Sequence, residues 1–284
     1  MENIDQVYVG EELPDPSVET SEIGPNNPPW NVWIALVVWI ASVLAILIIP
    51  TAMVAVYVVP KAGQFAGSSA DFIEFIKTDP TAVILQIVGI VPAHIFTILL
   101  AWVVVTKFRK YSFRKTLGWD FAGMRWWQYA AILIGIFILS GIVTSVYPEA
   151  DNDLLRILRS SRAAVFIVAG LATFTAPLVE EVVYRGILYS AFQRAFGVTV
   201  SVVIVTALFA AVHFPQYWPS YSTLVLLTVL SLTLTLVRVQ TRNLLPCIIL
   251  HTIFNGAQSI LLVLEPYISK TAPDVEAALL HLWK

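Results

Sequence analysis

The sequence is dominated by apolar segments long enough to cross a lipid bilayer. The first, residues 32–59, contains no charged residue and is interrupted only by Pro50. Because about 20 apolar residues cross the hydrocarbon core, a stretch of this length predicts a tilted or kinked membrane helix. Further mainly apolar segments follow at 82–105, 127–147, 163–192, 198–212, 223–237 and 244–264. We therefore expect an all-α, polytopic membrane protein, with about seven to eight transmembrane helices enclosing an intramembrane polar cavity.

The composition supports a membrane protein and excludes other classes. Of the 284 residues, 58% are hydrophobic and only 13% are charged, and the mean hydropathy is +0.78. So few charges would not cover the surface of two soluble domains. The net charge of −2 gives no electrostatic basis for binding nucleic acid. Cys247 is the single cysteine, so no internal disulfide is expected.

Charge is unevenly distributed along the chain. The first 29 residues carry seven acids and no Lys or Arg, which predicts an acidic, disordered tail (1–29) ahead of a helical membrane domain (30–284), with no cleavable signal sequence. Residues 107–125 concentrate six Lys and Arg next to Trp126 and Trp127, a pattern typical of a cytoplasmic loop. We expect the amino terminus in the cytoplasm and the protein in the plasma (inner) membrane of a prokaryote.

Polar groups interrupt three of the apolar segments. Each charged group at the centre of a membrane helix costs about 2.5 to 3.5 kcal/mol, so such groups are functional candidates by default. The candidates are Glu180, Glu181 and Arg185 in the fourth segment, His213 at the end of the fifth, and His251 with Asn255 in the seventh.

The spacing of these residues separates their roles. Glu181 and Arg185 are four residues apart and share a helix face, so a structural ion pair is one interpretation of them. Glu180 lies roughly 100° around the helix and cannot use Arg185 equally well, which leaves it free for chemistry. His251 and Asn255 repeat the four-residue spacing on another helix.

Three other residues of these segments are expected to be structural. Phe209 precedes His213 by one turn and would pack beneath its ring. His94 follows a proline in the second segment and has no acidic neighbour there, so a satisfied hydrogen bond is the favoured reading. Cys247 is more consistent with a small hydrophobic side chain than with a nucleophile.

Two chemistries fit the candidates. A carboxylate near a histidine deprotonates a water molecule, while Asn and His donate hydrogen bonds to a developing oxyanion, as peptide hydrolysis requires. Glu180, His213 and His251 also make a familiar zinc set, although the sequence has no HExxH motif. We expect no required cofactor, with zinc as the alternative.

The same residues resemble the motifs of a known family. EEVVYR, which begins at Glu180, resembles an EExxxR motif; FAAVH, ending at His213, resembles FxxxH; and HTIFN, beginning at His251, resembles HxxxN. Together, over about residues 175–256, they resemble the type II CAAX prenyl endopeptidase and bacteriocin-processing (CPBP, formerly Abi) family.

The resemblance implies roles for the individual residues. Glu180 would activate water with His213 beside it, Glu181 and Arg185 would brace that carboxylate, and His251 with Asn255 would form the oxyanion site. The implied activity is intramembrane endopeptidase cleavage of a membrane-associated or prenylated (CAAX-type) substrate. A zinc-dependent version of this protease, a non-catalytic membrane immunity or scaffold protein, and an ion-coupled transporter are the alternatives.

One expectation concerns depth in the membrane. Counted from the expected helix ends, Glu180 lies about 21 Å, His213 about 24 Å and His251 about 12 Å from the inner face. A single site needs a common depth, so we expect tilt and a kink at Pro177 to bring these residues together.

Overall fold

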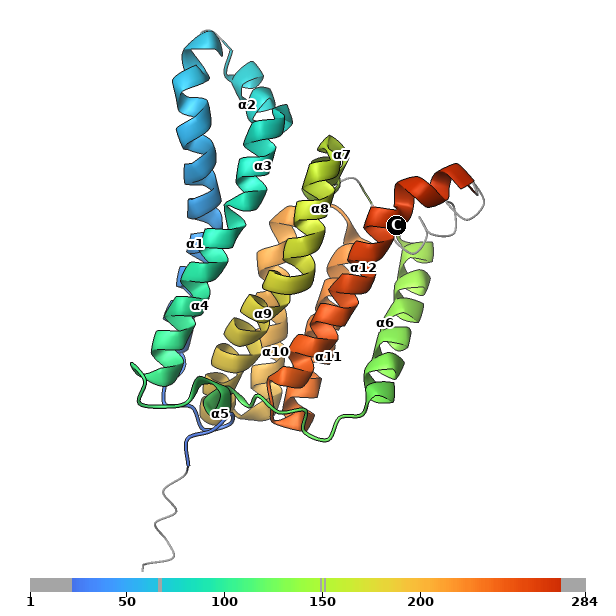
Figure 1. Cartoon of the computed structure of the whole chain (residues 1–284). Helices are drawn as coiled ribbons and strands as arrows, with labels where there is room; N and C mark the ends of the chain where they lie inside the picture. The colour runs from blue at the N-terminus through green and yellow to red at the C-terminus, as the bar shows by residue number, and fades with distance from the viewer. Residues whose placement is uncertain (1–21, 66–67, 149, 151, 272–284) are drawn as a thin grey trace, which may run out of the picture.

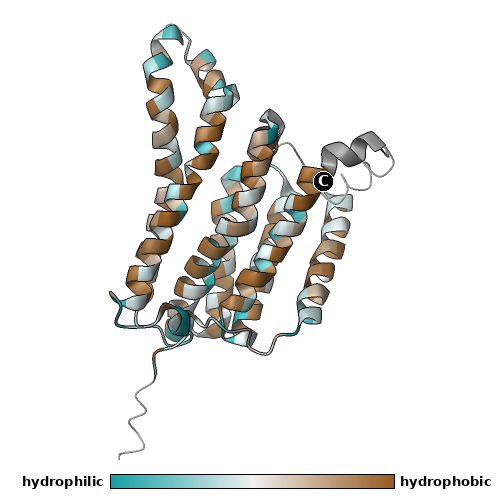
Figure 2. Cartoon of the chain, viewed as in Figure 1, coloured by the Kyte–Doolittle hydropathy of each residue, from teal (hydrophilic) through white to brown (hydrophobic). Residues whose placement is uncertain are grey.

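The computed structural model describes residues 22–65, 68–148, 150 and 152–271, and these form helices joined by short connections (Figure 1). Seven segments among them are long and apolar enough to cross a membrane, which confirms the predicted all-α membrane fold. These segments are Val32–Phe65, Pro80–Thr106, Trp126–Val146, Arg162–Phe196, Val198–Tyr217, Tyr221–Thr241 and Leu245–Leu264. Hydrophobic residues cover these helices along most of their length (Figure 2). The protein is therefore an integral membrane protein.

The first two spans form a closely packed hairpin. Helix α1 (Val32–Val58) packs against α3 (Pro80–Val88) and α4 (Ile90–Thr106). The second span, expected as one helix, is divided at Gly89, where an added Cβ would lie 2.6 Å from Cα of Pro50. Glycine is therefore required where the two backbones meet. The short helices η1 (Val59–Phe65) and α2 (Ser69–Thr78) close the hairpin.

The fourth span is an α-helix with two π-helical interruptions. It comprises α8 (Arg162–Gly170), η2 (Leu171–Thr175), α9 (Ala176–Glu181) and η3 (Val182–Leu188), and then enters α10. Both η2 and η3 are π-helical, with bonds that reach five residues back instead of four. Pro177 lies in the first turn of α9, where its missing N–H costs little, so the predicted start of a second helical piece at Pro177 is confirmed.

The last three spans run back and forth beside the fourth. Helix α10 (Tyr189–Tyr217) bends sharply at Gly197, whose φ of 79° favours glycine. It continues past Phe214 to Tyr217, so His213 lies one turn before its end and not at its end as expected. Helices α11 (Tyr221–Thr241) and α12 (Leu245–Thr271) follow.

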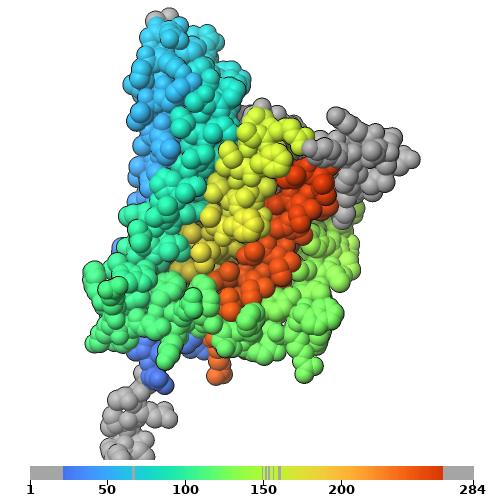
Figure 3. Space-filling model, in the orientation of Figure 1, coloured from blue at the N-terminus to red at the C-terminus, as the bar shows by residue number. Residues whose placement is uncertain are grey.

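The helices are arranged with the fourth span and α12 between the α1–α4 hairpin and α6 (Trp126–Val146) (Figure 1). In the space-filling view, α4, α8, α12 and α6 follow one another across the visible face (Figure 3). The connection that contains the basic residues 107–125 and α5 (Phe113–Leu117) crosses one end of the bundle, which we call the basic end. The short helix α7 (Asp153–Ser160) lies at the opposite end.

The segment 22–31, which we call the amino-terminal strap, is bound at the basic end. Of the predicted tail, residues 1–21 lie outside the described residues. Within the strap, the indole Nε1 of Trp30 donates a 3.0 Å hydrogen bond to the carbonyl oxygen of Ile187 in η3, and Trp30 is 2% exposed. The guanidinium of Arg194 binds the carbonyls of Pro28 and Trp30, and that of Arg238 binds the carbonyl of Pro25. The strap thus fixes the ends of α10 and α11.

Candidate functional site

Glu181 is the centre of a buried network that joins two helices. Its Oε1 accepts one hydrogen bond from Nη1 of Arg185 at 2.9 Å and another from Nδ1 of His251 at 2.8 Å. The side chains of Glu181 and Arg185 are fully buried. The predicted ion pair on one face of the fourth span is therefore present, and it also binds the seventh span.

The remaining donors of Arg185 are satisfied by α11 and by an aromatic ring. Its Nη2 donates to the hydroxyl and carbonyl oxygens of Ser231, both at 2.8 Å, and its Nε donates to Oγ1 of Thr235 at 3.3 Å. Its Cζ lies 4.9 Å from the ring centroid of Phe209. A buried guanidinium needs such compensation, because an unpaired charge in a low-dielectric interior is costly.

Glu180 has a different environment from its neighbour. Its side chain is 23% exposed, whereas that of Glu181 is fully buried. Oε2 of Glu180 lies 3.9 Å from Nε2 of His251, a contact that is an ion pair when the ring is protonated. Glu180 is thus the carboxylate of the pair that remains accessible, and His251 lies between the two acids.

His213 is held by its own helix. Its Nδ1 lies 2.7 Å from the carbonyl oxygen of Phe209, and the two rings are tilted by 33° with centroids 4.6 Å apart. The predicted packing of Phe209 beneath His213 is therefore found. Phe209 also meets His251, with ring centroids 6.3 Å apart, so this phenyl ring lies close to both histidines. No hydrogen bond or ion pair joins His213 to Glu180 among the described side chains.

Both site histidines use Nδ1 in the same way. A carbonyl and an ionised carboxylate only accept hydrogen bonds, so Nδ1 carries a proton in His213 and in His251. Nε2 is the ring nitrogen that these two bonds leave unused. When Nε2 is unprotonated, this arrangement suits a proton acceptor or a metal ligand.

Asn255 connects α12 to the first π-helical segment. Its Nδ2 donates a 2.9 Å hydrogen bond to the carbonyl oxygen of Ala172 in η2. Ser259, one turn later, donates to the carbonyl of Ala169 at 3.3 Å and accepts from Thr173. A polar stripe on α12 thus donates hydrogen bonds to carbonyl groups of α8 and η2.

His94 is a further polar residue in the same region. It belongs to α4, is 7% exposed, and its Nδ1 lies 2.9 Å from Oγ1 of Thr175 in η2. The satisfied hydrogen bond expected for His94 is therefore present.

The structure gives the carboxylates and His251 a common depth. Nδ1 of His251 lies 2.8 Å from Oε1 of Glu181, and its Nε2 lies 3.9 Å from Oε2 of Glu180. The unequal depths counted from the helix ends are therefore wrong for these three residues.

The described residues do not form a ready metal site. No group of three or more His, Cys, Asp or Glu within 22–65, 68–148, 150 and 152–271 is gathered closely enough to hold a metal ion. Of the zinc candidates, Glu180 lies near His251, but no contact joins His213 to either of them among the described residues. The donor set in this conformation therefore does not fit a zinc ion.

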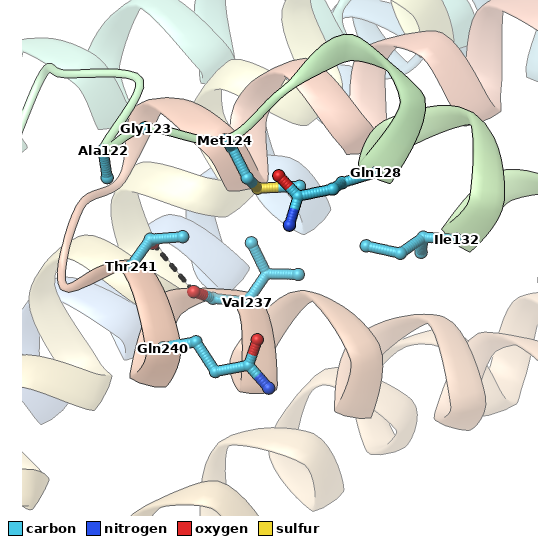
Figure 4. A pocket seen from close by; sticks show the side chains of 8 residues that line it. All are labelled: Ala122, Gly123, Met124, Gln128, Ile132, Val237, Gln240 and Thr241. Carbon is cyan, nitrogen blue, oxygen red and sulfur yellow. Dashed lines mark hydrogen bonds between the residues drawn. The ribbon is translucent and has the colours of Figure 1, made fainter.

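A pocket of about 220 Å³ lies at the basic end, away from these residues. Figure 4 shows Gln128 and Ile132 of α6 facing Val237 and Gln240 of α11 across it. None of the six candidate site residues lines this pocket.

The fold and the polar cluster define a polytopic membrane protein with two acids, an arginine and a histidine bound together inside its helical bundle. Residues 162–257 match the family model described as Type II CAAX prenyl endopeptidase Rce1-like. The chain thus contains a domain of the Rce1-like type II CAAX prenyl endopeptidase family (CPBP/Abi), and this membership implies an intramembrane protease that acts on protein substrates. No curated protein and no solved structure matches the chain.

Proposed function

We propose that this protein is an intramembrane endopeptidase that uses Glu180 to activate a water molecule. The observation that carries the proposal is the contrast between the two adjacent carboxylates. Glu181 is fully buried and bound by Arg185 and His251, whereas Glu180 is 23% exposed and faces Nε2 of the same histidine. Of the two carboxylates, Glu180 is the one that the protein does not fully enclose, and we assign the attacking water to it.

The hydrolysis follows from these positions. Water donates a hydrogen bond to Glu180, which takes its proton while the water oxygen attacks the scissile carbonyl carbon. The tetrahedral oxyanion receives a hydrogen bond from Asn255, whose second amide hydrogen is not used by the bond to Ala172. The C–N bond then breaks, and Glu180 returns the proton to the leaving amine. Atoms and protons balance without a covalent intermediate.

The remaining members of the network orient the reacting groups. Arg185 and His251 hold Glu181 in place, and Glu181 in turn fixes the ring of His251 beside Glu180. His213 presents its Nε2 as an acceptor for the second hydrogen of the water. The gap between His213 and Glu180 would close when substrate binds. The second oxygen of Glu181, Oε2, is buried without a hydrogen-bond partner among the described atoms, which leaves an acceptor for a bound water or a substrate N–H.

The substrate class we propose is a lipid-anchored peptide that carries a prenylated CAAX-type carboxyl terminus. The family description supports a CAAX prenyl substrate. A prenyl chain would partition into the bilayer and bring the peptide to a site within the membrane helices. We also propose that the basic end faces the cytoplasm, because Lys and Arg are concentrated in residues 107–125.

The test is hydrolysis of a prenylated CAAX reporter peptide by purified protein in liposomes. We expect the wild type to cleave it, and Glu180→Ala to lose at least about 100-fold in turnover. Glu74→Ala, which removes an exposed acid from α2, is the matched control and should leave turnover unchanged. An unprenylated peptide of the same sequence measures how much the lipid contributes. Equal turnover by Glu180→Ala and the wild type would overturn the proposal.

A second variant of Glu180 distinguishes an endopeptidase from a non-catalytic scaffold protein. Glu180→Gln keeps the shape and hydrogen-bonding capacity of the side chain but cannot take a proton. A protein whose polar residues only hold the helices together would tolerate this change, whereas the endopeptidase would lose turnover and keep its thermal stability.

A further inference from the structure

Six positively charged side chains of the connection 107–125 are exposed at the basic end, and we call them the basic surface. They are Lys107, Arg109, Lys110, Arg114, Lys115 and Arg125. None of the six makes an ion pair with another described residue. Asp120, the one acid of this connection, accepts a hydrogen bond from the backbone N–H of Ala122. The basic surface therefore has no paired counter-charge within the described part of the chain.

The amino-terminal strap lies directly against this connection. A Cβ added at Gly118, whose φ is 77°, would lie 2.9 Å from Cγ of Pro25 in the strap. Only a residue without a side chain lets the strap approach so closely. Gly118 directly follows α5, the short helix that carries Arg114 and Lys115. The strap is thus in contact with the chain segment that presents two of the six cations.

The strap also fixes the place at which residues 1–21 join the described chain. Gly24 and Asn27 exchange two backbone hydrogen bonds of 3.2 and 3.0 Å, which close a tight turn. Glu22, the first described residue, lies two residues before this turn and is exposed. Residues 1–21 are therefore attached to the bundle beside the basic surface.

The segment attached there has the opposite charge. Residues 1–21 contain no Lys or Arg and six acids, which are Glu2, Asp5, Glu11, Glu12, Asp15 and Glu19. One exposed ion pair is weak and is screened by salt. A segment tethered next to its binding surface, however, has an effective concentration on the order of 1 mM. A dissociation constant of that order is enough to occupy the surface, and several weak pairs together provide it.

We propose that residues 1–21 bind the basic surface of the same chain. The acids of this segment pair with the six cations, and the strap holds the segment where the pairing takes place. Anionic lipid headgroups are the competing partner, because they carry the same charge and lie at the same membrane face. Docking of the segment neutralises the basic surface from within the chain and keeps these headgroups away from it. The inference does not depend on the proposed hydrolysis.

The test is zero-length cross-linking with a carbodiimide, which joins a carboxylate to a lysine amine only where the two groups touch. The full-length protein is treated in liposomes of phosphatidylcholine and phosphatidylglycerol, digested, and analysed by mass spectrometry. We expect amide links between residues 1–21 and the three lysines of the basic surface at low salt. High salt screens the charges and should lower their yield at least about fivefold. Lys77, an exposed lysine of α2, reports links between separate molecules and should give none.

A variant of the basic surface separates binding from mere proximity. Replacing its three arginines, Arg109→Gln with Arg114→Gln and Arg125→Gln, removes half of the positive charge and keeps the three lysines that report the contact. Binding predicts that the yield of links falls at least about threefold, with thermal stability unchanged. The wild-type yield in this variant would show that the segment is only tethered nearby and would overturn the proposal. No links in the wild type at low salt would assign the basic surface to lipid headgroups instead.

Discussion

Nδ1 of His251 and Oε1 of Glu181 lie 2.8 Å apart, although 70 residues separate them in the sequence. This bond joins α12 to the fourth span near the buried Arg185. It gives the carboxylate of Glu181 a structural role. The adjacent Glu180 is left accessible beside the same ring. A structural acid and a reactive acid are thus placed next to each other by two consecutive residues of one helix.

The first prediction concerns the buried ion pair. Glu181→Ala leaves the guanidinium of Arg185 without its carboxylate, and breaking a buried pair from one side costs about 3 to 5 kcal/mol. We expect a clear fall in the thermal unfolding temperature in detergent, measured by tryptophan fluorescence. The double variant Glu181→Leu with Arg185→Met removes both charges and should recover most of the stability, but not activity. If Glu181→Ala were as stable as the wild type, the ion pair of Glu181 with Arg185 would not be what stabilises the helix bundle.

The second prediction concerns the amino-terminal strap. Trp30→Phe keeps the buried ring but loses the N–H that donates to the carbonyl of Ile187, a hydrogen bond whose net contribution is about 1 kcal/mol. A measurable drop in unfolding temperature is expected. Trp33→Phe is the matched control, because Trp33 is 75% exposed and its substitution should leave the unfolding temperature unchanged. Equal effects of the two substitutions would contradict the role of the Trp30 indole.

The strap and the π-helical segments mark a limit of sequence reasoning. The seven spans and the break at Pro177 were predictable, because apolar length and a missing N–H are local properties. The π-helical turns of η2 and η3 were not, since they depend on carbonyl partners such as Trp30 and Asn255 that are distant in sequence. The expected end of the fourth helix near Arg194 agrees with a span that runs to Phe196, but counting residues from the helix ends gave the site residues different depths.

The third prediction separates catalysis from packing on α12. Asn255→Ala removes the proposed oxyanion donor, for which losses of about 100- to 1,000-fold in kcat are typical. Ser259→Ala, one turn further, removes another hydrogen bond to the same segment of the fourth span and should change kcat by less than about twofold. Similar losses in both variants would mean that Asn255 acts only by holding η2.

The candidate residues themselves were predictable to different extents. Glu181 with Arg185 follows from a four-residue spacing on one helix, and Phe209 with His213 follows in the same way. The bond between Glu181 and His251 joins separate helices, so spacing gave no information about it. For His94, the expected satisfied hydrogen bond is present, although its partner Thr175 lies on another helix.

The fourth prediction concerns metal dependence. The described donors do not gather around a common point, and the proposed mechanism needs no metal ion. Turnover should survive dialysis against a strong chelator, and purified active protein should contain well under one zinc per chain by elemental analysis. Activity that is lost on chelation and regained with zinc would instead require His213, His251 and Glu180 to move together around a metal.

The central claim is that Glu180 activates the water that cleaves the peptide bond. The most direct measurement is cleavage of the prenylated reporter in ¹⁸O-labelled water, with both products analysed by mass spectrometry. The account predicts one ¹⁸O atom in the new carboxyl group for the wild type and at least about 100-fold less labelled product for Glu180→Gln, which keeps the fold. Labelled product from Glu180→Gln at the wild-type rate would contradict it.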